Sequence, residues 1–200
     1  MGKDSTVSIL KVLVSILAID RNIEVDTAKT LLIMGADPRA EVEFMFAQDM
    51  PVDTTRNKII DDFLESGCDW LISIDDDVGC EKNPIDLCFL GKDIIFLPTP
   101  IIQGGKLTIN VDYLEEGKGL REIKKGGTGC FVLSRKAAEI IEKPLFKFLY
   151  DQNGYCILGE DYYFSENARK NFKLYAHTDY LCKHIKGIDL LTLSGNFFRR

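Results

Sequence analysis

The sequence lacks the features that mark secreted, membrane-spanning and nucleic-acid-binding proteins. Its longest apolar stretch, Val12 to Ile19, is far shorter than the roughly 20 residues of a membrane span. Met1 to Ser8 is polar and has no basic region, long apolar core or small-residue cleavage site of a signal peptide. There is no long basic run, and 25 basic against 31 acidic residues give a net charge of −6, which argues against a non-specific nucleic-acid footprint. We therefore expect a soluble, cytoplasmic protein with no membrane span and no nucleic-acid partner.

Paired cysteines are also missing, because the chain has six cysteines but no Cys-x-x-Cys pair. They are Cys68, Cys80, Cys88, Cys130, Cys156 and Cys182. Most lie inside apolar segments, which predicts reduced thiols in the core rather than zinc ligands or disulfides.

Internal repeats and low-complexity tracts are absent as well. With 200 residues, of which 46% are hydrophobic, the chain has material for one substantial core, and we predict a single domain over residues 1–200.

The order of apolar segments in the first 78 residues predicts a β-α-β-α-β unit. The predicted strands and helices are Lys11–Ile19, Glu24–Gly35, Glu41–Ala47, a helix capped by Asp53 or Thr54 and ended by Gly67, and Trp70–Ile74. The less regular second half predicts the segments Ile85–Leu90 (helix), Asp93–Leu97 (strand), Lys106–Val111 and Leu120–Ile123 (ribbons), Gly129–Ser134 (strand), and Arg135–Glu142 and Glu160–Asn171 (helices). With right-handed crossovers this gives an α/β fold: a central, mostly parallel sheet flanked by helices, with a small antiparallel ribbon.

The most informative feature is a buried strand that ends in three carboxylates. Trp70 to Ile74 is uniformly apolar, as in a central strand covered on both faces, and Asp75, Asp76 and Asp77 follow directly. Ligands of open α/β sheets bind outside the carboxyl ends of such strands. Three adjacent carboxylates repel each other unless a cation neutralises them, and Mg²⁺ and Mn²⁺ take oxygen ligands of this kind. The alternative is a solvated acidic turn.

Four motifs, taken together and in this order, resemble the GT-A class of nucleotide-sugar glycosyltransferases. They are Asp75-Asp76-Asp77, similar to the Asp-x-Asp motif; Arg56-Asn57 in the preceding helix; the glycine-led strand from Gly127 to Arg135; and Gly159-Glu160-Asp161 with His184 downstream. The resemblance runs from about Lys11 to Gly187. It implies a single GT-A, Rossmann-like domain with a nucleotide-binding half over about 1–97 and an acceptor-side half over about 98–200.

The resemblance implies transfer of a sugar from a nucleotide-sugar donor, with a UDP-sugar the commonest choice, to a hydroxyl group of a glycan or glycoconjugate. It makes the reaction dependent on Mn²⁺ or Mg²⁺, held by Asp77 directly, by Asp75 directly or through waters, and by His184. The implied nucleotide-binding residues are Ala18, Asp20, Arg21, Arg56, Asn57, Asp75, Asp76 and Lys186. Asp76 is expected to face the nucleoside, and residues 18–21 to line the base pocket.

Physical arguments support some of these roles and leave alternatives open. In an extended chain Asp75 and Asp77 point to the same side. The guanidinium of Arg56 suits a phosphate, and it suits equally well a structural contact with the acidic triplet. His184 is either a metal ligand or a surface histidine between lysines, and Lys186 either reaches the pyrophosphate or is solvated.

An inverting transferase needs a carboxylate base for the acceptor hydroxyl, and we assign this role to Asp161, with Glu160 as the alternate. Both residues also suit a structural position at a helix N-terminus.

Two other functions are compatible with the sequence. A haloacid-dehalogenase-like phosphatase also carries Asp-x-Asp at a strand end, although usually on its first strand, whereas here two βα units precede it. A non-catalytic nucleotide-sugar binding protein would bind a nucleotide with Mn²⁺ without transferring sugar. The donor base, acceptor, stereochemistry and oligomeric state are left open. The chain length suggests a bacterial, phage or viral enzyme, in the last case lying in the host cytoplasm, or a module of a longer protein.

Overall fold

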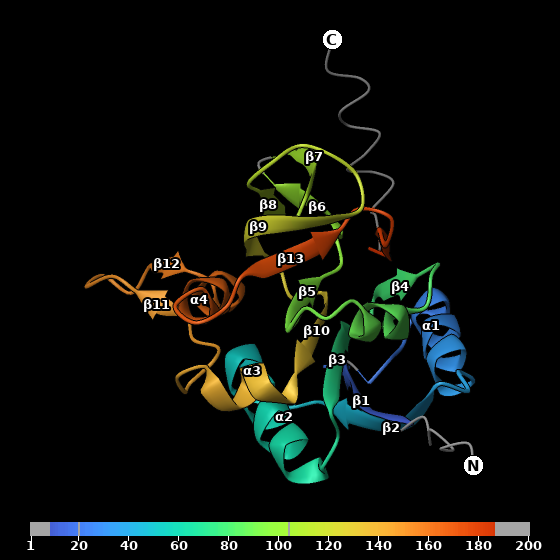
Figure 1. Ribbon diagram of the computed structural model, residues 1–200. Coiled ribbons are helices and arrows are strands. Elements are labelled where there is room, and N and C mark those ends of the chain that lie inside the picture. Colours follow the sequence, from blue (N-terminus) through green and yellow to red (C-terminus); the bar gives the residue numbers. More distant parts are fainter. Residues whose placement is uncertain (1–8, 20, 104, 187–200) are drawn as a thin grey trace, which may run out of the picture.

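Strands that are buried along almost their whole length form the centre of the main sheet. The computed structural model describes residues 9–19, 21–103 and 105–186. The sheet has eight strands in the order β2-β1-β3-β10-β5-β13-β9-β8 (Figure 1). Strands β10 and β9 run opposite to the other strands. The α/β class and the central, mostly parallel sheet are therefore confirmed.

The predicted β-α-β-α-β unit is present at the N-terminal side of the sheet. Its elements are β1 (Leu10–Leu17), α1 (Val25–Gly35), β2 (Ala40–Ala47), α2 (Val52–Ser66) and β3 (Trp70–Asp75). Strand β1 pairs in parallel with β2 on one side and with β3 on the other. Gly67 ends α2 in the left-handed conformation with φ of 76°, as predicted. The predicted cap of α2 is wrong: the N-cap is Pro51, no side chain caps the helix, and Asp53 lies within its first turn.

The second half forms the rest of the sheet and three small antiparallel ribbons, β6 with β7, β11 with β12, and β4 with β14. Its elements are β4 (Val78–Cys80), the 3-10 helix η1 (Pro84–Phe89), β5 (Ile94–Phe96), β6 (Pro100–Gln103), β7 (Lys106–Ile109), β8 (Val111–Tyr113), β9 (Leu120–Gly126), β10 (Cys130–Ser134), α3 (Arg135–Ile140), β11 (Leu149–Tyr150), β12 (Cys156–Leu158), α4 (Glu160–Ala168), β13 (Leu174–His177) and β14 (Cys182–His184). Strand β13, which lies between β5 and β9, was not predicted, because four residues are too few for a clear alternation.

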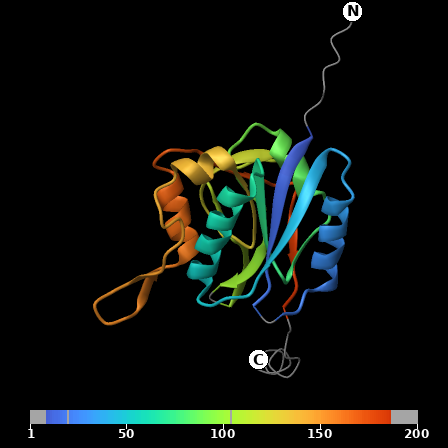
Figure 2. The ribbon, with the colours of Figure 1, turned by 90° about the horizontal axis from the view of Figure 1, so that it is seen from below.

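Helices cover both faces of the sheet. Helix α1 lies on one face, and α2 and α4 lie on the other (Figure 2). The alternation along β1 matches this arrangement. Leu13 and Leu17 pack in the core layer beneath α2, α3 and α4, whereas Val12, Val14 and Ile16 pack in the layer beneath α1 and η1. No helix within the described ranges is both long enough and apolar enough to cross a bilayer.

The insertion of β10 between β3 and β5 is what brings the distant motifs together. Strand β10 pairs antiparallel with both neighbours, so its amino end lies beside the carboxyl end of β3, with Cys130 opposite Ile74. The backbone N–H of Asp75 donates to the carbonyl of Gly129 at 2.9 Å. The acidic motif and the glycine-led strand, more than 50 positions apart in the chain, therefore meet at one edge of the sheet.

Candidate functional site

A cleft of about 180 Å³ opens at this edge of the sheet, beyond the carboxyl end of β3. Residues from all four predicted motifs line it. The lining residues are Arg56, Asp75, Val78, Thr99, Ile101, Asn110, Gly127, Thr128, Gly129, Glu160, Asp161 and His184. The fold thus gathers in one place side chains that the sequence separates by more than 120 positions.

Arg56 connects three parts of the cleft wall. Its side chain is almost fully buried, and its Nη2 donates to Asp75 Oδ1 at 3.0 Å. Its Nη1 donates to the carbonyl of Thr128 at 3.3 Å, and its Nε lies 3.7 Å from Glu160 Oε1. The Nε–H is buried and makes no hydrogen bond among the described residues. Of the two roles considered for Arg56, the structural contact with the acidic motif is therefore present.

Asp75 is held by this guanidinium at the end of β3. Burial raises the pKa of the Asp75 carboxyl above its usual value, although Arg56 counteracts the rise. The chain turns directly after Asp75, and β4 begins at Val78. The expectation that Asp75 and Asp77 point to the same side assumed an extended chain, but residues 76 and 77 form a turn, so strand alternation does not apply to Asp77.

Asp77 lies beside His184, which comes from the opposite end of the chain. Strand β14 pairs with β4, and the N–H of Ile185 donates to the carbonyl of Asp77 at 2.8 Å. This ladder places His184 Nε2 3.4 Å from Asp77 Oδ2. The ammonium group of Lys186 also contacts Asp77 Oδ2. Two of the three predicted metal ligands therefore meet, with a cationic side chain at the same carboxylate.

The hydrogen bonds of His184 determine which of its nitrogens faces Asp77 as an acceptor. Nδ1 lies 2.8 Å from the carbonyl oxygen of Pro100, which can only accept a hydrogen bond. Nδ1 therefore carries a proton, and in the neutral ring Nε2 presents a lone pair toward a carboxylate oxygen. Two acceptors at this distance require a proton or a cation between or beside them. Metal-bound histidines show the same arrangement, with the non-ligating N–H donating to a backbone carbonyl.

Asp75 is not gathered as closely with these two residues. Within the described part of the chain, the only three His, Cys, Asp or Glu residues whose ligand atoms all lie within 4.8 Å of one another are Cys80, Cys130 and Cys182. Asp77 and His184 supply an oxygen and an imidazole nitrogen, a donor set that fits Mn²⁺. The Asp75 carboxylate binds Arg56 instead. This position is compatible with a water-mediated contact to a metal ion or with a direct contact to a ligand in the cleft.

Glu160 and Asp161 also line the cleft, at the N-terminus of α4. Burial raises the pKa of both carboxyls, and the negative charge of Asp161 adds to the effect on Glu160. Asp161 Oδ1 accepts a hydrogen bond from the N–H of Tyr162 at 2.7 Å, which fixes its orientation. The first turn of α4 thus presents two partly buried carboxylates with increased proton affinity.

Two cleft residues, Thr99 and Asn110, were not identified from the sequence. Asn110 Oδ1 accepts from the N–H of Thr99 at 2.8 Å, and the N–H of Gly127 donates to the carbonyl of Asn110 at 2.7 Å. A Cβ atom on Gly127 would lie 2.7 Å from Asn110 Nδ2, so the glycine permits this close packing. Both residues lie in the segment without periodicity, which offered no signal for them.

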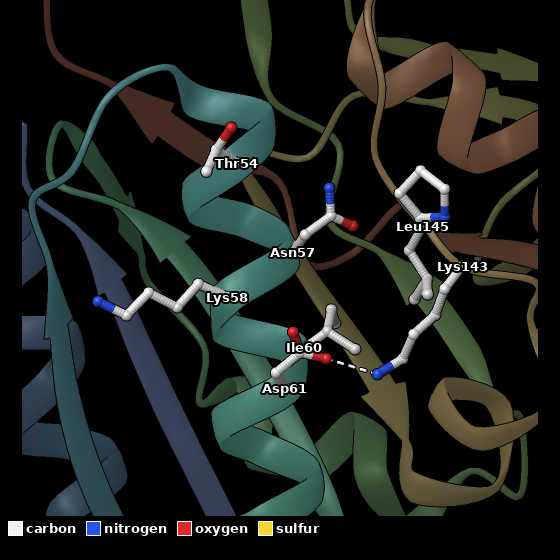
Figure 3. A pocket seen from close by; sticks show the side chains of 8 residues that line it. Thr54, Asn57, Lys58, Ile60, Asp61, Lys143 and Leu145 are labelled. Carbon is white, nitrogen blue, oxygen red and sulfur yellow. Dashed lines mark hydrogen bonds and ion pairs between the residues drawn. The ribbon is translucent and has the colours of Figure 1, made fainter.

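Asn57 does not line the cleft, although its neighbour Arg56 does. Its Nδ2 donates to the carbonyl of Phe146 at 2.7 Å, and its Oδ1 accepts from the N–H of Phe146 at 3.1 Å. It lies instead in a larger hollow of about 540 Å³ between α2 and residues 143–145 (Figure 3). The Asp61–Lys143 ion pair closes this hollow on one side, and no cluster of carboxylates lies in its wall. The hollow therefore contains fewer side chains than the cleft that could bind a metal ion or transfer a proton.

The predicted base-pocket residues lie outside the lining of the cleft. Ala18 is buried in the core layer beneath α1, and Arg21 is exposed with a left-handed φ of 59°. Asp20 lies outside the described residues. The carbonyl of Asp76 accepts from the N–H of Glu24 and from Thr27 Oγ1, both at 2.9 Å, which joins the acidic turn to α1. The nucleotide roles of these residues stay predictions.

No known protein-family model matches the sequence, and no curated protein is significantly similar to it. Solved structures share its fold. The chain is similar to A197 from STIV, with a TM-score of 0.65 and 19% identity, over 89% of this chain and 87% of that one. It is similar to the inositol-1-phosphate CTP transferase from T. maritima, with a TM-score of 0.53 and 9% identity, over 92% and 93% of the two chains. It is also similar to UDP-glucose pyrophosphorylase complexed with UDP-glucose, with a TM-score of 0.50 and 12% identity, over 85% and 90%.

Proposed function

We propose that the chain is a metal-dependent glycosyltransferase that uses a nucleotide-sugar donor. The observation that carries the proposal is the Asp77–His184 pair, a carboxylate oxygen and an imidazole nitrogen 3.4 Å apart beyond the carboxyl end of a central strand, a donor set that suits Mn²⁺. In the cleft, Glu160 and Asp161 provide carboxylates for proton transfer. A fold shared with structures named as CTP transferase and pyrophosphorylase is compatible with a nucleotide ligand.

Each residue has a distinct task in this proposal. Asp77 and His184 would hold a Mn²⁺ or Mg²⁺ ion, which would stabilise negative charge on the leaving diphosphate. Arg56 holds Asp75 in place, and its Nε lies 3.7 Å from Glu160 Oε1. Lys186, which contacts Asp77, would bind the diphosphate of the donor.

Asp161 is the proposed base for the acceptor hydroxyl. Burial raises its pKa, which makes its ionised form a stronger base than an exposed aspartate. The hydrogen bond from Tyr162 N–H occupies Oδ1 and leaves Oδ2 for the acceptor. Inversion at the sugar, a UDP donor and a glycan acceptor are parts of the proposal that follow from the GT-A resemblance.

Nucleotidyl transfer is the second candidate, because two of the structures that share the fold bear names of nucleotidyltransferases. The two reactions consume the same class of compound but yield different products. A glycosyltransferase releases a nucleoside diphosphate, whereas a nucleotidyltransferase acting in reverse on pyrophosphate forms a nucleoside triphosphate and a sugar phosphate.

The decisive experiment incubates the protein with a panel of nucleotide-sugars and of hydroxyl acceptors, with Mn²⁺ or with EDTA and with or without pyrophosphate, and identifies products by liquid chromatography and mass spectrometry. We expect the protein to release nucleoside diphosphate from one of the nucleotide-sugars, and to do so only when the metal ion is present. Nucleoside triphosphate formed only with pyrophosphate would favour the second candidate. Release of phosphate from a generic phosphomonoester would indicate the phosphatase, and donor binding without turnover by any acceptor would indicate a binding protein.

Three variants separate the proposed roles. Asp161→Asn should lower turnover by at least about 100-fold while donor binding is retained. Asp77→Asn should abolish metal-dependent donor binding itself. Asp112→Asn, at an exposed position of β8, is the matched control and should behave like the wild-type protein. Full turnover in Asp161→Asn would refute the assignment of the base.

A further inference from the structure

Three buried thiols from three distant strands meet next to the site. Cys80 ends β4, Cys130 begins β10, and Cys182 begins β14. Their sulfur atoms all lie within 4.8 Å of one another. All six cysteines are free and five are buried, which agrees with the predicted core position of most of them; their convergence was not predicted.

Cys80 and Cys182 are the closest pair, with their sulfur atoms 3.2 Å apart. They lie directly opposite each other in the antiparallel β4–β14 ladder. The N–H of Cys182 donates to the carbonyl of Pro98 rather than across the ladder, which makes this a non-hydrogen-bonded pair. In such pairs the Cα atoms are about 4.5 Å apart, within the range that a disulfide requires. The backbone thus needs no rearrangement for a bond to form.

The surroundings favour a disulfide over a bound metal ion. The thiols lie in an apolar core layer, where several thiolates around an ion would leave uncompensated negative charge at a high desolvation cost. His184 is the nearest imidazole in sequence, but its Nδ1 is engaged with Pro100 and its Nε2 faces Asp77. Zinc would lack its usual fourth ligand. A disulfide is neutral and needs only two sulfur atoms.

We propose that Cys80 and Cys182 form a disulfide bond when the protein meets a small-molecule disulfide such as oxidised glutathione. Cys80 reacts first, because it is the more exposed of the two residues, at 8% against 2% for Cys182. Its thiolate attacks one sulfur of the oxidant, which forms a mixed disulfide and releases one thiol. Cys182 then attacks the Cys80 sulfur and releases the second thiol, so both thiol protons end on the released molecules.

The bond would act on the neighbouring site through β14. This strand joins the fold by its ladder with β4, and it carries His184 two residues after Cys182. A covalent link closes a loop of about 100 residues in the unfolded chain, which is among the more stabilising lengths. The disulfide would also fix β14 to β4 and so keep His184 next to Asp77.

The test uses wild-type protein equilibrated with oxidised or reduced glutathione, followed by alkylation, peptide mapping and thermal unfolding. We expect a peptide that links Cys80 to Cys182, an intact mass lower by two hydrogen atoms, and a melting temperature higher by about 10 °C. Cys182→Ala and Cys80→Ala should lose the link and the shift. Cys130→Ala and the exposed Cys156→Ala should keep both and are the matched controls.

Three results would overturn the proposal. One is the absence of any intramolecular link in folded, oxidised wild-type protein. Another is a link from Cys80 to Cys130, whose sulfur atoms are 4.0 Å apart. The third is one zinc ion per chain in the purified protein, lost on mutation of any of the three cysteines. Because the mapping uses wild-type protein, a variant that fails to fold does not affect the result.

Discussion

Arg56 shows how one side chain can decide the electrostatics of the cleft. It lies within 4 Å of carboxylates from β3 and α4, and it is almost fully buried itself. Truncating a buried partner of this kind leaves charges without compensation, which is far more costly than losing an exposed pair. Burial raises the pKa of Asp75, Glu160 and Asp161. Keeping these groups ionised at neutral pH therefore lowers the free energy of unfolding of the protein.

Asp161→Asn should therefore stabilise the protein in a pH-dependent manner. Burial raises the pKa of Asp161 in the folded state, so the stability associated with its neutral form is present below the usual aspartate pKa of about 3.8 and is lost as the pH rises through the raised value. Asn mimics the neutral form at every pH. We expect equal melting temperatures near the acid limit and, by pH 7, an advantage of at least about 2 °C for the variant. Equal melting temperatures at pH 7 would show that burial of this carboxylate costs nothing.

Among the elements, α2 connects the edge of the sheet that bears the cleft to the segment that follows α3. Arg56 and Asn57 are adjacent but face different partners, the first the cleft and the second the backbone of Phe146. The Asp61–Lys143 pair, one turn further along, joins the same two elements (Figure 3). The hairpin β11–β12, which follows this segment, projects from the body of the protein (Figure 1).

Asn57→Ala should lower stability without weakening donor binding. The change leaves the N–H and C=O of Phe146 without their partner, a loss of about 1–3 kcal/mol that corresponds to several degrees in melting temperature. Asn171→Ala, at an exposed position, is the control and should have little effect. An unchanged melting temperature together with lost nucleotide affinity would instead support the nucleotide role implied by the family resemblance.

At the scale of the whole molecule, the site depends on elements from both ends of the chain. Strand β14 brings His184 to the acidic motif more than 100 positions earlier, and β10 inserts between β3 and β5. Ligand binding at such a junction should stabilise the entire fold, because several elements contribute to it.

Metal and nucleotide should therefore raise the melting temperature together. At a ligand concentration about 100 times the dissociation constant, the stabilisation is about 2.7 kcal/mol, or roughly 5–10 °C for a chain of this length. We expect this shift with one nucleoside diphosphate plus Mn²⁺, and its removal by EDTA. Asp77→Asn should show no such shift. A full shift with the nucleotide in the presence of EDTA would contradict a metal-dependent site.

The β-α-β-α-β unit, the acidic end of β3 and the glycine cap of α2 could all be predicted from the amino-acid sequence. These depend on local periodicity and local backbone preferences, and neighbouring residues suffice to express them. The short strand β13 was not predicted, because its four residues carry too little pattern.

Which side chains meet in the cleft could not be predicted, because it depends on the folded arrangement. This arrangement directed Arg56 to Asp75 and Asn57 to Phe146, placed His184 beside Asp77 across a turn where strand alternation no longer applies, and brought three thiols together. The physical reason is that such contacts depend on strand order and ladder register between segments far apart in the chain. Neither quantity is contained in the local pattern of either segment.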